Sequence, residues 1–158
     1  MSTWTSQQLA DSTCHGSLTL NGLSMNNSAW ASLNNYVLWP PANRRGSNIA
    51  IPGRSGRIAV PRRKDETSRT LECLVIGDCD ITGTPYASRS VGLATNCMLL
   101  DSSLFGWTGT SVAAVLTLPN GAVRSGAVQI VHVEYGSPGV EGVLTFTLDI
   151  DIPDGELT

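Results

Sequence analysis

The final 15 residues of the chain contain a stretch in which apolar and polar side chains alternate with a period of two. Its apolar members are Leu144, Phe146, Leu148, Ile150 and Ile152, and its polar members are Thr145, Thr147, Asp149 and Asp151. Successive side chains of a strand point to opposite faces of a sheet. The pattern therefore predicts a strand with one face in a core and the other in water, which is typical of an antiparallel sheet.

The same period recurs elsewhere, and one segment has helical spacing. Strands are expected at 17–20, 69–76, 112–118, 122–135 and 139–152, and a hairpin from 49–51 and 57–63 around a Pro-Gly-Arg-Ser-Gly turn. The helix is expected at about 90–104, because Leu93, Cys97, Leu100 and Leu104 recur at spacings of four, three and four. A chain of 158 residues suits one domain. We expect an all-β domain with one helix, specifically a β-sandwich with an extended hairpin arm at about 45–69.

Positive charge is concentrated in this arm. Eight of the ten basic residues are Arg44, Arg45, Arg54, Arg57, Arg62, Arg63, Lys64 and Arg69. With two acids among them, positions 44 to 69 carry a net charge of +6, and the rest of the chain, with two basic and eleven acidic residues, carries −9. Such an arm can bind nucleic acid, fold onto its own acidic surface, or dock on an identical neighbour. A contact of the last kind is head to tail, and it makes a ring when the rotation closes.

The arm is the main candidate for a subunit interface. Its proposed contact residues are Arg45, Ile49, Ile51, Arg54, Arg57, Ile58, Val60, Arg62, Arg63, Lys64 and Arg69. The isoleucines and the valine give the hairpin an apolar face that an isolated ribbon would leave exposed. An acidic sequence pI near 5.2 and an arm without aromatic residues disfavour nucleic-acid recognition as the main role. A solvated hairpin without a partner remains an alternative.

Catalysis and metal binding have little support in the sequence. No nucleophile elbow, metalloprotease motif or phosphate-binding glycine loop occurs, and we expect neither an enzyme nor a cofactor. A metal site built from Cys14, His15, Cys73 and Cys79 is disfavoured because no close cysteine pair is present. No apolar run approaches the roughly 20 residues of a membrane span, so no membrane partner is expected.

Several blocks of the sequence together resemble a known family. They are "LNGLSMNNSAWASL", "IPGRSGRIAVPRRKDETSRTLECLVIG", "VGLATNCMLLDSSLFG", "AVLTLPNGAVRSGAVQIVHVEYG" and "LTFTLDIDIPDGEL". In this order they resemble the distal tail proteins of long-tailed bacteriophages, in the short form known as minor tail protein in phages of actinobacteria. The most specific block is the second, in which a Pro-Gly-x-x-Gly turn precedes a basic strand and then an apolar strand that ends in glycine.

The resemblance implies a structural protein of the virion tail, made in the host cytoplasm. Distal tail proteins form a hexameric ring, with the tail tube protein above and the tip or hub protein below, and DNA passes through the ring without specific binding. The wet strand face with Asp149 and Asp151 is then a candidate for the channel wall, although an outer surface fits the pattern equally. Two alternatives stay open: a tail tube or terminator ring protein, and a monomeric β-sandwich module that binds a glycan or nucleic acid.

Overall fold

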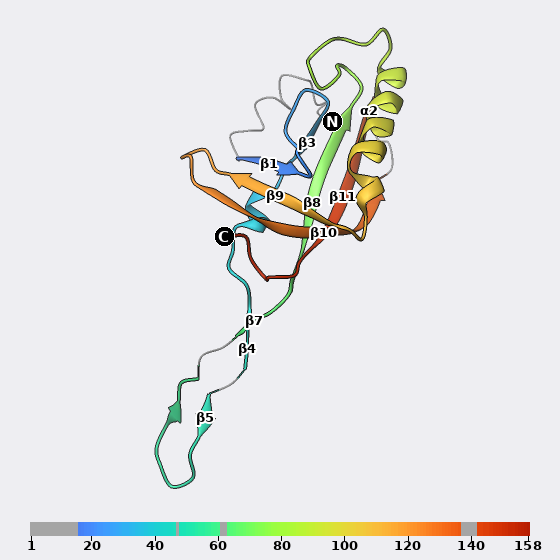
Figure 1. Cartoon of the computed structure of the whole chain (residues 1–158). Helices are drawn as coiled ribbons and strands as arrows, with labels where there is room; N and C mark the ends of the chain where they lie inside the picture. The colour runs from blue at the N-terminus through green and yellow to red at the C-terminus, as the bar shows by residue number, and fades with distance from the viewer. Residues whose placement is uncertain (1–15, 47, 61–62, 137–141) are drawn as a thin grey trace.

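In the part of the chain that the structure describes, the body is one antiparallel sheet with a single α-helix, and a two-stranded arm projects from it (Figure 1). The computed structural model describes residues 16–46, 48–60, 63–136 and 142–158. The seven strands of the sheet, in spatial order, are β2 (Leu23–Ser24), β1 (Ser17–Leu20), β9 (Ser111–Thr117), β10 (Val123–Tyr135), β11 (Val143–Ile152), β8 (Thr67–Ile76) and β3 (Trp30–Ser32). The helix α2 spans Arg89–Ser103, and 3₁₀ turns cover Asn35–Leu38 (η2) and Phe105–Trp107 (η3).

The sheet curls, so that its two halves cover one core. Leu18 and Leu116 from β1 and β9 belong to the same buried cluster as Leu71 and Leu148 from β8 and β11. The register of β10 against β11 shifts between Ile130 and His132, and a bulge of this kind increases local bend and twist. The predicted mostly-β fold with one helix is confirmed, and the two layers expected of a sandwich are the two halves of this continuous sheet.

A short segment after β2 brings the two edges of the curled sheet together. Met25 N–H donates to the carbonyl of Leu18 on β1 (2.7 Å), and the Met25 carbonyl accepts from Ser32 N–H on β3 (2.9 Å). The mostly buried side chain of Asn26 repeats this link, accepting from Leu18 N–H (3.2 Å) and donating to the Ser32 carbonyl (3.2 Å). A polar side chain lies here because backbone groups at sheet edges need partners when buried.

Helix α2 packs directly on the end of β8 through two glycines. A Cβ added at Gly92 would lie 2.1 Å from the carbonyl oxygen of Gly77, and one added at Gly77 would lie 2.0 Å from that of Arg89. Beside them the fully buried Asn96 donates to the Ile76 carbonyl (2.7 Å) and accepts from the Tyr86 hydroxyl (2.9 Å). The close approach of helix and strand therefore depends on positions without a side chain.

The predicted helix and strands lie within a few residues of those in the structure, with two differences. Leu100 of the helix and Leu104, its C-cap residue, are buried as expected. The inward face of the helix also holds Gly92 and Asn96, while Leu93 and Cys97 are only partly buried. Residues 30–41 contain strand β3 and the 3₁₀ turn η2, in a region where the sequence pattern predicted no regular element.

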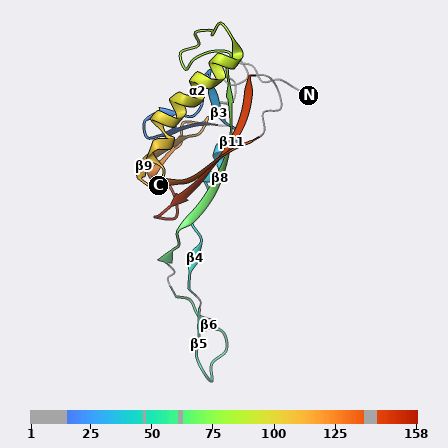
Figure 2. The same cartoon turned by 90° about the vertical axis from the view of Figure 1, so that its right-hand side faces the viewer.

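The arm consists of two short ladders in line. Near the body β4 (Arg44–Arg45) pairs with β7 (Arg63–Lys64), and farther out β5 (Ile49–Ala50) pairs with β6 (Arg57–Ile58). Figures 1 and 2 show the arm extending away from the sheet in both views, so its outer end does not fold back onto the body. An extended chain rises about 3.3 Å per residue, so every ten residues of an arm strand can reach about 30 Å from the body.

Candidate assembly surfaces

The outer end of the arm, here called the arm tip, comprises residues 48–60 (Figure 1). It exposes apolar side chains. Ile49 and Ile58 are opposite each other in the ladder and are 56% and 46% exposed, and Ile51 is 37% exposed. Gly53 and Gly56 have φ values of +80° and +81°, which allow the chain to reverse between the two strands. Single exposed apolar residues are common on protein surfaces, but three on one narrow ribbon form an unpartnered patch.

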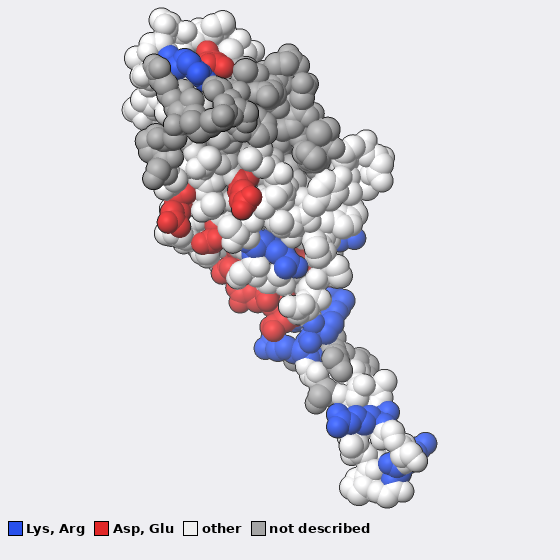
Figure 3. All heavy atoms as spheres, turned by 180° about the vertical axis from the view of Figure 1, so that it is seen from behind, with Lys and Arg blue, Asp and Glu red and all other residues white. Residues whose placement is uncertain are grey.

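Two arginines of the arm tip accompany this patch. Arg54 and Arg57 are exposed, and with Ile51 and Ile58 they line a shallow hollow at the turn. Neither arginine belongs to an ion pair among the described residues. Figure 3 shows blue side chains along the arm and red ones over the body, as the sequence predicted.

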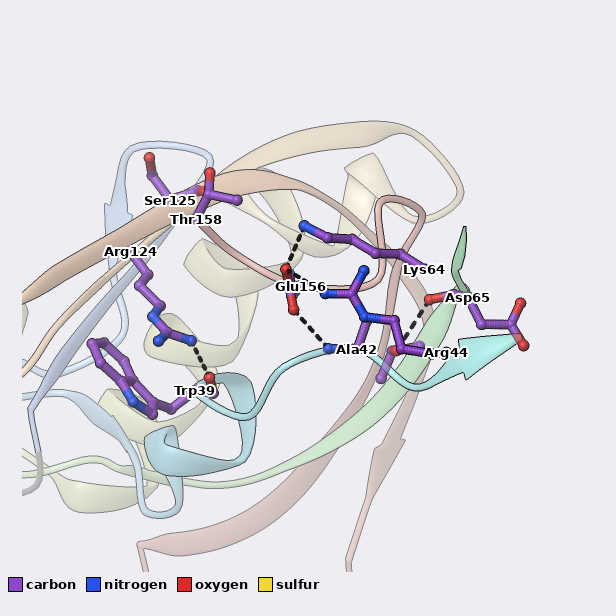
Figure 4. A network of polar contacts seen from close by, with 10 residues as sticks. Trp39, Ala42, Arg44, Lys64, Asp65, Arg124, Ser125, Glu156 and Thr158 are labelled. Carbon is purple, nitrogen blue, oxygen red and sulfur yellow. Dashed lines mark hydrogen bonds and ion pairs between the residues drawn. The ribbon is translucent and has the colours of Figure 1, made fainter. Parts of the chain in front are cut away.

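The inner end of the arm, here called the arm root and comprising residues 42–46 and 63–66, is held to the body by ion pairs (Figure 4). The carboxylate of Glu156 contacts the Lys64 ammonium and lies 4.0 Å from the Arg44 guanidinium. Arg45 pairs with Asp65 across the root at 2.9 Å. The positive charge of the arm is thus divided between a root, where Arg44, Arg45 and Lys64 pair with the molecule's own acids, and a tip, where Arg54 and Arg57 have no such pair among the described residues.

Glu156 is the most strongly engaged acid of this network. Its carboxylate also accepts the Ala42 N–H at 2.8 Å, and its side chain is 13% exposed. The hydrogen bond from Lys64, then the Ala42 N–H, lower the pKa of Glu156 below its ordinary value of 4.5. The sequence analysis did not single out Glu156, because its partners lie 92 and 114 positions away.

The other predicted interface residues lie in different places. Val60 is half-buried, and its N–H donates to the side chain of Asn48 at 3.4 Å. Arg63 pairs with Arg45 in the root ladder, and Arg62 lies outside the described residues. Arg69 belongs to β8 in the body, opposite Ile150 on β11, so the arm ends before it. The Arg69 Nε is buried and has no hydrogen-bond partner among the described residues.

The outer face of the sheet, opposite the core, carries a group of acids that includes both predicted channel-wall residues. Asp149 and Asp151 are half-buried and accept hydrogen bonds from the hydroxyls of Thr70 (2.8 Å) and Ser68 (2.5 Å) on β8. In the next register position, Thr147 lies between Glu72 on β8 and Glu134 on β10. The alternation along the last strand predicted Asp149 and Asp151 on this face. Glu72 and Glu134 belong to other strands, and only strand pairing brings them to the same face.

Neither a metal centre nor a membrane-spanning helix is found in the described part of the chain. No group of three or more His, Cys, Asp or Glu side chains is arranged there to hold a metal ion. Cys14 and His15, two members of the cysteine-based site considered above, lie outside the described residues. None of the described helices is long and apolar enough to cross a bilayer.

Comparison with solved structures identifies a protein with the same fold. The crystal structure of SPP1 Dit, described as a paradigm of the hub adsorption apparatus in phages that infect Gram-positive hosts, superposes with a TM-score of 0.54 over 89% of this chain, at 13% sequence identity. The chain is similar in fold to a phage hub protein. It spans 50% of the length of SPP1 Dit. No protein-family model and no curated protein sequence matches it.

Proposed function

We propose that this protein is a structural subunit of a phage tail, and that its copies assemble head to tail into a ring, of about six subunits, at the distal end of the tail. The ring joins the tail tube protein above to the tip or hub protein below and leaves a channel for DNA. The observation that carries the proposal is the projecting arm, whose tip exposes an apolar and cationic surface on a body that has the fold of SPP1 Dit.

The physical chemistry of the arm tip favours a protein partner. A two-stranded ribbon is marginally stable in water by itself. Burying Ile49, Ile51 and Ile58 on a neighbour would contribute about 1.5–3 kcal/mol for each side chain that becomes fully buried. Arg54 and Arg57 would add ion pairs, which contribute most when they are desolvated and little at an exposed rim.

The geometry of such a contact determines the type of assembly. The arm tip is basic and apolar and the body is acidic, so the two contacting surfaces differ. A contact between two different surfaces is heterologous, and it generates a ring when the rotation closes. In this ring the acids Glu72, Glu134, Asp149 and Asp151 would face the channel, where like charge keeps the phosphate backbone of DNA from adhering.

Light scattering coupled to size exclusion tests the ring. A ring of six subunits of 16.7 kDa has a mass of about 100 kDa. Arg54→Gln combined with Arg57→Gln is expected to shift the protein toward one subunit. A matched control, Ser90→Glu with Ala94→Glu, makes the same change in net charge at exposed positions of α2 and is expected to leave the assembly intact. Arm variants that assemble as well as the control would refute the role of the arm.

The same experiment separates the other functions. A monomeric binding module predicts the mass of one subunit for every variant, together with affinity for a glycan or nucleic acid. DNA binding through several phosphates would weaken steeply between about 50 and 200 mM salt. A tail tube or terminator ring predicts the same mass as a distal ring, and gold labelling of purified particles separates these by position along the tail.

A further inference from the structure

The residues after β11 turn sharply and run back across the arm root. The turn is at Gly155, whose N–H donates to the Ile152 carbonyl (2.9 Å) and whose φ is +86°. A Cβ at this position would lie 2.3 Å from the carbonyl oxygen of Asp65 and 2.6 Å from the Cβ of Ala42. The segment therefore touches the root so closely that only glycine fits at the contact.

The far end of this segment is fixed to the body. Leu157 is 1% exposed and belongs to the main core cluster. Thr158 and Ser125 on β10 exchange two backbone hydrogen bonds, of 3.0 and 3.1 Å. Figure 4 shows Thr158 beside Ser125, with the Glu156 carboxylate between them and the arm root. The segment is thus attached to β10 and to the core, and it can resist movement of the arm.

Between turn and anchor, the Glu156 carboxylate contacts both chains of the arm. Ala42, whose N–H it accepts, lies on the chain that enters the arm, and Lys64 lies on the chain that leaves it. Other charged groups lie near this carboxylate. Arg44 and Arg124 line one surface hollow together with Glu156, and Asp65 is paired with Arg45. One carboxylate of the body therefore contacts both chains of the arm root, which are already paired with each other in the β4–β7 ladder.

We propose that the segment Pro153–Thr158 is a latch that holds the arm root against the sheet and so sets the direction of the arm, with Glu156 as the contact to both of its strands. The latch lies within one chain, so the inference does not depend on a ring. A docking arm held in one direction in advance loses less conformational freedom on binding than one that swings freely.

Hydrogen–deuterium exchange followed by mass spectrometry tests the latch in assembled and unassembled protein alike. Glu156→Gln keeps a neutral oxygen that can accept the Ala42 N–H but removes the charge, whereas Glu156→Ala removes both contacts. Asp154→Asn changes an exposed acid of the same segment and is the matched control. Exchange of peptides from the arm root is compared with that of peptides from β11, and the tryptophan emission of the protein, to which the fully buried Trp30 contributes, reports that each variant is folded.

The latch predicts a definite order of exchange at the arm root. The Asp154→Asn protein should exchange like the unmodified protein, the Glu156→Gln protein faster, and the Glu156→Ala protein faster still, by about tenfold or more, which is the size expected for loss of an ion pair and a hydrogen bond to a charged group. Exchange of β11 should stay unchanged in all three. Equal exchange at the root of the Glu156→Ala and Asp154→Asn proteins would overturn the proposal, whether or not the protein forms a ring.

Discussion

Asn26→Ala is expected to destabilise the fold by about 3 kcal/mol, because this side chain joins the two edges of the curled sheet. Its Oδ1 accepts the N–H of Leu18 (3.2 Å) and the side-chain amide of Asn35 (3.1 Å), and its Nδ2 donates to the Ser32 carbonyl (3.2 Å). Asn35 keeps a second acceptor, the Gly16 carbonyl at 3.0 Å. Leaving one of these buried polar groups without a partner costs about 1–3 kcal/mol, and loss of the hydrogen bonds that Asn26 makes with the other two groups adds to that cost.

The assay is thermal unfolding followed by the fluorescence of the four tryptophans, of which Trp30 is fully buried, at a fixed protein concentration. For a domain of this size, about 3 kcal/mol corresponds to a decrease in melting temperature of about 6–12 °C. The control is Asn120→Ala, which removes an exposed hydrogen bond to Ala122 N–H (3.0 Å) that water can replace, and its effect should stay within about 0.5 kcal/mol. If the two variants melt alike, Asn26 does not close the sheet as described.

Three further predictions concern the helix contact, a buried thiol and the latch. Gly92→Ala should destabilise the protein by about 1–3 kcal/mol in urea unfolding, although alanine is the better helix former, because its Cβ would lie 2.1 Å from the Gly77 carbonyl; an unchanged or raised stability would contradict the contact. Burial raises the pKa of the Cys73 thiol to about 12, so iodoacetamide at pH 8 should modify this residue only after unfolding, and peptide mass spectrometry of the native protein would expose an error. The pKa of Glu156 is lowered in the folded state, so its contribution to stability should be present above pH 4.5 and disappear as the pH falls below it; a stability difference between the unmodified protein and Glu156→Gln that is the same at pH 3 and pH 6 would argue against this.

The sequence by itself determined those features that depend on near neighbours along the chain. Alternation of period two placed β10 and β11, and Asn-Gly is a strong local signal for a hairpin turn, which is found at Asn21-Gly22 between β1 and β2, where both residues have positive φ. A second Asn-Gly pair, Asn120-Gly121, lies in the turn between β9 and β10, where only the glycine has a positive φ. The separation of a basic arm from an acidic body is a matter of composition, and it too was readable from the sequence.

Tertiary structure alone decided which distant residues meet. The latch brings Glu156 to Ala42 and Lys64. The closure of the sheet places Asn26 between Leu18 and Ser32, and the packing of the helix on β8 places Gly92 against Gly77. A lone glutamate, asparagine or glycine has no periodic signature, because its role comes from a partner that the chain supplies only after strand order and register are set. The strand period shows which face of a strand is buried, but only the register of β8, β10 and β11 gathers four acids on the opposite face.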